Sequence, residues 1–124
     1  MALLTSQSII SAFIGKSVNN DNLAKCGWKQ GIGEDVPHYN VYSSTFLYKP
    51  ELIEAFGVTQ KLKELWERRG TEFVVSVHVT DGKITSASIS KENEGDGARP
   101  SGRTLVSTQQ DLRIARRILE YITA

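Results

Sequence analysis

The residues best suited to nucleophilic or metal chemistry in this chain are Cys26, His38 and His78. A histidine beside a cysteine can accept the thiol proton and create a thiolate nucleophile. The spacing of these residues does not require them to meet, and free cysteine is among the most buried residue types. Two histidines far apart in the sequence also make a weak case for a metal site. We therefore assign no catalytic residue, metal ligand or cofactor, and leave open whether the protein is an enzyme. A small enzyme that uses Cys26 and a histidine is one alternative.

An acidic stretch near the C-terminal third has part of the spacing of a calcium-binding loop. Glu92, Glu94, Asp96 and Gly97 occupy positions one, three, five and six of the EF-hand template. The template then fails, because its eighth and twelfth positions are both arginine here. Glycine, proline and charged residues dominate 92–102, so we predict a solvated and mobile surface loop.

Arginines near the C-terminus could bind phosphate groups if they converge. Two lie in or beside the Gly-rich loop and three on the predicted last helix: Arg99, Arg103, Arg113, Arg116 and Arg117. The formal net charge is only +1, so the chain as a whole creates no strong field for a polyanion. Nucleic-acid binding through these five arginines is therefore the first alternative, ahead of an enzyme, and it is not favoured over binding to a protein.

The element that must position most of these groups is a β-hairpin over about 72–90. Its first strand alternates large apolar residues with polar ones, and Asp81-Gly82 supplies a turn. We predict a three-residue turn with a bulge at Gly82, which pairs Val75 with Ala87 and Val77 with Thr85. That register collects the apolar side chains on one buried face. It leaves the other face mostly polar, with His78, Val74 and Ile84 accessible on it.

The remaining pattern places helices around this hairpin. Apolar residues at helical spacing predict helices over about 6–14, 50–69 and 107–122, the last capped by Ser107. Gly57 leaves open whether 50–69 holds two helices or one kinked helix. Strand formers over 38–49 predict a strand, and a brief edge strand is expected at 103–106. We predict a single α+β domain over 1–124, with a small antiparallel or mixed sheet and helices mainly on one face.

These features favour a small soluble module that binds or regulates another protein. Its predicted contact residues on the sheet are Val74, His78 and Ile84, and its predicted partner is another protein or a second copy of the chain. A single cysteine suits a reducing compartment, and no apolar run is long enough to span a membrane. We therefore predict a cytoplasmic location and no membrane contact.

Overall fold

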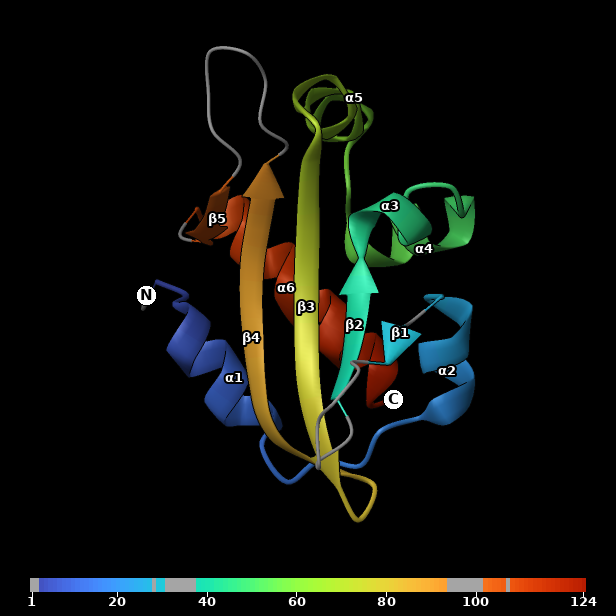
Figure 1. Cartoon of the computed structure of the whole chain (residues 1–124), viewed down its shortest axis with the longest axis vertical. Coiled ribbons are helices and arrows are strands. Elements are labelled where there is room, and N and C mark those ends of the chain that lie inside the picture. The colour runs from blue at the N-terminus through green and yellow to red at the C-terminus, as the bar shows by residue number, and fades with distance from the viewer. Residues whose placement is uncertain (1–2, 28, 31–37, 94–101, 107) are drawn as a thin grey trace.

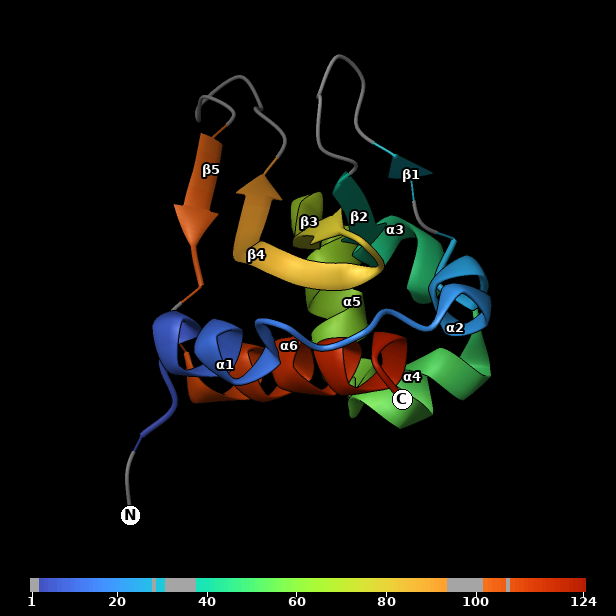
Figure 2. The same ribbon diagram turned by 90° about the horizontal axis from the view of Figure 1, so that it is seen from below.

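The computed structural model describes residues 3–27, 29–30, 38–93, 102–106 and 108–124. These residues form an α+β fold in which a five-stranded antiparallel sheet has the order β1-β2-β3-β4-β5. Figure 1 shows the sheet in front of helix α6, and Figure 2 shows the helices gathered below one face of the sheet. The predicted fold class is therefore confirmed. No helix in these residues is long and apolar enough to cross a membrane.

The elements of the described residues follow one another with short connections. The helices are α1 (Ser6–Phe13), α2 (Asn20–Lys25), α3 (Ser43–Phe46), α4 (Pro50–Phe56), α5 (Gln60–Arg69) and α6 (Gln109–Ile122). The strands are β1 (Lys29–Gln30), β2 (His38–Tyr42), β3 (Thr71–Thr80), β4 (Lys83–Asn93) and β5 (Gly102–Leu105). Two helices, rather than one kinked helix, occupy 50–69, because Gly57 ends α4 in the left-handed conformation with φ 71°.

Two predicted boundaries are wrong for identifiable reasons. The strand predicted over 38–49 ends at Tyr42, and the chain turns into helix α3 because the Glu72 carboxylate accepts hydrogen bonds from the first residues of that helix. The last helix is capped by Thr108 instead of Ser107, since the Thr108 side chain accepts the Asp111 N–H at 3.3 Å.

The turn of the β3–β4 hairpin differs from the prediction. Asp81 and Gly82 both have positive φ, 53° and 76°, as a two-residue type I′ turn requires. The turn therefore pairs Val79 with Ile84, and the predicted bulge at Gly82 is wrong. The register instead shifts just before Val79, because Thr85 on β4 has no partner in the ladder.

Because Thr85 is unpaired, the apolar face of β4 that was predicted to be buried still faces the core beyond it. Beyond it, Val77 pairs with Ala87 and Val75 pairs with Ile89, which is two residues away from the predicted register on β4. A shift of two residues keeps the side chains beyond Thr85 on their predicted faces. Val75, Val77 and Ile89 are accordingly buried in the core between the sheet and the helices.

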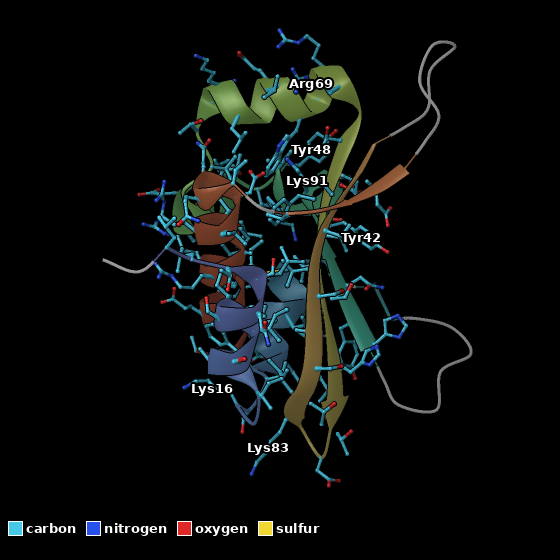
Figure 3. All side chains as sticks on the ribbon, turned by 90° about the vertical axis from the view of Figure 1, so that its left-hand side faces the viewer. Lys16, Tyr42, Tyr48, Arg69, Lys83 and Lys91 are labelled. Atoms are coloured by element: carbon cyan, nitrogen blue, oxygen red, sulfur yellow. The ribbon has the colours of Figure 1, made fainter. Side chains whose placement is uncertain are left out.

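An ion pair between Lys91 and Asp111 lies at one end of the core between the sheet and the helices. Lys91 lies on the helix side of β4 (Figure 3), opposite the buried Phe73. Its Nζ is 2.8 Å from Oδ2 of Asp111, whose side chain is only 5% exposed in the first turn of α6. This contact ties the first turn of α6 to the end of β4. It also explains how a lysine and an aspartate occupy positions that face the core.

Candidate functional site

Cys26 lies on the helix side of the sheet and is fully buried at the end of α2. Burial raises the pKa of its thiol to about 11, and the nearby charge of Lys49 only partly opposes this effect. His38 and His78 share the alternation of Asn40 and Ser76, on the face that the helices leave open. The Cys26 thiol therefore lies on the opposite side of the sheet from both histidines. The cysteine–histidine pair that the enzyme alternative requires is not formed.

The two histidines themselves come together. His38 on β2 is directly opposite His78 on β3, and their ring centroids are 5.1 Å apart with an angle of 56° between the planes. Both residues are half-buried, and within the described part of the chain Nδ1 of His38 is buried without a hydrogen-bond partner. The sequence predicts an accessible His78 on the open face, but it does not predict the pairing with His38.

Of the predicted contact residues on the sheet, Ile84 is the clearest correction. Its side chain is only 1% exposed and belongs to the core, because the skipped Thr85 turns Ile84 towards the helices. Val74 does lie on the open face, between Tyr42 and Ser90 in the register, but it is buried as well. Neither side chain offers accessible surface to a partner.

The arginines are only partly described. Arg113, Arg116 and Arg117 are exposed on α6, and Nε of Arg116 is 3.8 Å from Oε1 of Glu120. Arg103 falls in β5, and Arg99 lies outside the described residues. The convergence of loop and helix arginines therefore stays a prediction. Most of the acidic loop, 94–101, also lies outside the described residues, although its ends extend β4 and begin β5.

A hollow in the described part of the structure lies where the sheet meets α3 and α5. Its volume is about 770 Å³, and we call it the acidic groove. Its lining residues come from β2, α3, α5, β3, β4 and the turns between them: Tyr42, Ser43, Ser44, Leu47, Tyr48, Trp66, Glu67, Gly70, Thr71, Glu72 and Glu92. Figure 3 labels Tyr48 just below α5 and Tyr42 lower down, beside the sheet.

Hydrogen bonds hold the Glu72 side chain in place within the acidic groove. Its Oε2 accepts hydrogen bonds from the Ser43 hydroxyl at 2.7 Å and from the Ser44 N–H at 2.6 Å, and its Oε1 accepts the Ser44 hydroxyl. The Ser43 hydroxyl in turn accepts the Phe73 N–H at 2.8 Å. This network holds the Glu72 carboxylate in one orientation and joins α3 to β3.

Two further carboxylates give the groove its charge. Glu92 is directly opposite Glu72 in the β3–β4 ladder, and Glu67 lines the groove from the last turn of α5. Like charges placed opposite each other on a sheet repel. In the ladder, Arg103 of β5 is the residue paired with Glu92 on the other side of β4. The described lining contains no lysine, arginine or histidine.

Aromatic rings form the other part of the lining. Tyr48 is 75% exposed, which makes it one of the few large apolar side chains in the described residues that solvent reaches so fully. Trp66 is buried and stacks on Phe73, with centroids 5.2 Å apart and planes 16° apart. The groove thus combines a rigid aromatic wall, an exposed tyrosine and several carboxylates, which is an arrangement suited to a cation with an apolar stem.

No local sequence pattern indicates this groove. Trp66 falls within the helix predicted over 50–69, and Glu92 falls within the predicted acidic loop. Their meeting with Glu72 depends on the β3–β4 register and on the turn into α3, which local patterns do not determine. No protein family model, curated protein or solved structure matches the chain. The interpretation of the groove therefore rests on its own geometry.

Proposed function

We propose that the protein is a small binding module whose acidic groove receives a basic segment of a protein partner. The observation that carries this proposal is the composition of the described lining, in which Glu67, Glu72 and Glu92 accompany Tyr42 and Tyr48 without any basic side chain. An arginine or lysine of a partner matches such a lining in charge and shape. A reducing compartment such as the cytoplasm suits the single buried thiol of the module.

The energetics of such a contact are favourable but modest. A hydrogen bond to a charged group contributes about 1.5–3 kcal/mol, and a cation over an exposed tyrosine ring adds about 0.5–1 kcal/mol. One basic side chain in the groove would therefore contribute a factor of roughly a hundred in affinity. Because Glu67 and Tyr48 are well exposed, salt should weaken the contact.

Preorganisation supports the same proposal. Glu72 is already oriented by the Ser43 and Ser44 hydroxyls, so little side-chain entropy is lost when a cation approaches it. Glu72 and Glu92 stand opposite each other in one ladder, so a guanidinium or ammonium group placed between them would be attracted by both carboxylates.

The test uses a matched set of short peptides that differ at one central residue. The residue is arginine, lysine, citrulline or glutamate, and citrulline keeps the shape of arginine without its charge. Amide resonances of Gly70 and Thr71, which line the groove, report binding in a two-dimensional NMR titration. We expect the arginine and lysine peptides to shift these resonances and the citrulline and glutamate peptides not to do so.

Variants assign the binding to the groove. Glu67→Gln and Tyr48→Ala should each weaken the arginine peptide several-fold, because each removes one of the expected contacts. Glu54→Gln, an exposed residue of α4 outside the described lining, is the matched control and should leave binding unchanged. Equal shifts with the citrulline peptide, or equal losses in the control, would overturn the proposal. Dimerisation through the groove would show as concentration-dependent shifts without peptide.

A further inference from the structure

The open face of the sheet carries a second arrangement of chemistry, at the far end of β2 from the acidic groove. His38 begins β2 and Tyr42 ends it, so four residues of extended chain, about 13 Å, separate the two places. His38 and His78 are direct cross-strand neighbours whose rings stand 5.1 Å apart. This pair has no part in the binding of a basic segment proposed above.

The distance between the two rings fits a shared metal ion. Imidazole nitrogen binds Zn²⁺ at about 2.0–2.1 Å, and two imidazoles on one tetrahedral ion then have ring centroids about 5 Å apart. The 5.1 Å between the rings of His38 and His78 lies at that spacing. The angle of 56° between the ring planes leaves the rings tilted, whereas stacked aromatic rings would be close to parallel.

A second observation points to a missing partner at the same place. Nδ1 of His38 is buried and has no hydrogen-bond partner among the residues that the structure describes, whereas buried polar atoms in proteins are nearly always satisfied. The nearest polar neighbours along the strands are engaged with each other, because the Ser76 hydroxyl donates to Oδ1 of Asn40. An ion bound between the rings would give a histidine nitrogen the partner that the described protein does not supply.

We propose that His38 and His78 form a two-histidine site for a divalent transition metal ion, of which Zn²⁺ is the simplest representative. Imidazole nitrogen suits Zn²⁺, Cu²⁺ and Ni²⁺ and does not suit Mg²⁺ or Ca²⁺. Among the described residues, no group of three or more His, Cys, Asp or Glu residues could hold a metal ion. The two histidines therefore bind the ion with water in the remaining positions, which makes the affinity moderate and leaves positions open to an external ligand.

The first measurement uses the wild-type protein alone. Addition of ZnCl₂ should shift the imidazole carbon and nitrogen resonances of both histidines together, with the same saturation curve, and should raise the unfolding temperature. Mg²⁺ at the same concentration should do neither. Because a metal takes only neutral imidazole, acidification should release the ion. A shift of one histidine only, or no shift at millimolar Zn²⁺, would overturn the proposal without any variant.

Variants then test the assignment. His38→Gln and His78→Gln should each weaken Zn²⁺ binding at least tenfold, because a single imidazole remains. Cys26→Ala is the control for thiol binding and should keep the wild-type affinity, since the thiol lies on the other side of the sheet. Wild-type affinity in either glutamine variant, or its loss in Cys26→Ala, would contradict the two-histidine site.

Discussion

Removing the charge of Lys91 should destabilise the fold far more than removing a surface charge. Nζ of Lys91 is 2.8 Å from Oδ2 of Asp111, and the Asp111 side chain is only 5% exposed. Lys91→Met keeps the length and the apolar stem of the side chain but leaves the carboxylate buried without its partner. A carboxylate that loses its partner in this way is strongly destabilising, typically by about 3–5 kcal/mol.

Two features of the Lys91–Asp111 pair reduce the expected loss of stability. The Lys91 side chain is 27% exposed, so water reaches one side of the pair, and Asp111 lies in the first turn of α6, where the helix dipole favours a negative charge. We therefore expect Lys91→Met to lower the free energy of unfolding by about 2–3 kcal/mol. Asp111→Asn should cost less, because the Lys91 ammonium can turn towards solvent.

Urea unfolding followed by circular dichroism measures these differences. The double variant Lys91→Met with Asp111→Leu should recover most of the loss, since it removes the uncompensated charge. Arg116→Gln is the surface control, because the Arg116–Glu120 pair on α6 is exposed and should contribute less than about 0.5 kcal/mol. A cost for Lys91→Met no larger than that of the control would refute the argument that a buried ion pair joins α6 to the sheet.

Three other perturbations test separate parts of the structure. Gly27→Ala should lower the free energy of unfolding in urea by more than about 3 kcal/mol, because φ at Gly27 is positive and a Cβ there would overlap the Thr45 methyl group. Gly15 has a positive φ but open space around it, so Gly15→Ala should cost only about 1 kcal/mol. The thiol of Cys26, with its pKa raised to about 11, should react slowly until the chain unfolds. The unfolded thiol ionises first as pH rises, so the advantage of the wild type over Cys26→Ala should fall by about 2–3 kcal/mol between pH 8.5 and 11. Deletion of Thr85 should leave cooperative urea unfolding intact, since it removes the unpaired residue and keeps Val79 opposite Ile84 and Val77 opposite Ala87 on the core face.

Local patterns were sufficient for the fold class and for most elements. The alternation along β3 predicted a hairpin with one buried face, and the apolar stripe of α6 predicted a helix that covers it. The strand expected over 38–49 was wrong after Tyr42, because the residues that follow have strand propensity. Their helical turn depends on Glu72, thirty positions along the chain, and a distant carboxylate leaves no trace in a local pattern.

The candidate sites could not be predicted for a related reason. Both depend on which residue of one strand stands opposite which residue of the next. Apolar alternation excludes a slip of one residue, because such a slip exposes the core face, but it does not exclude a slip of two. The predicted hairpin register was wrong by this amount, and it still placed Val75 and Val77 on the correct face. A slip of two residues between β2 and β3 would separate His38 from His78 without exposing the core.

Polar contacts are what distinguish these otherwise equivalent registers. Along β2 and β3 the Ser76 hydroxyl donates to Oδ1 of Asn40, and just beyond the ladder the Ser43 hydroxyl donates to Glu72. Each contact is lost if the strands slip by two residues, whereas the apolar contacts of the core would be largely replaced by equivalent ones. The same hydrogen bonds therefore set the register that brings the histidines together and orient the carboxylate of the acidic groove. These polar contacts on the open face determine the register. The histidine pair and the acidic groove therefore form together, although they do not touch each other.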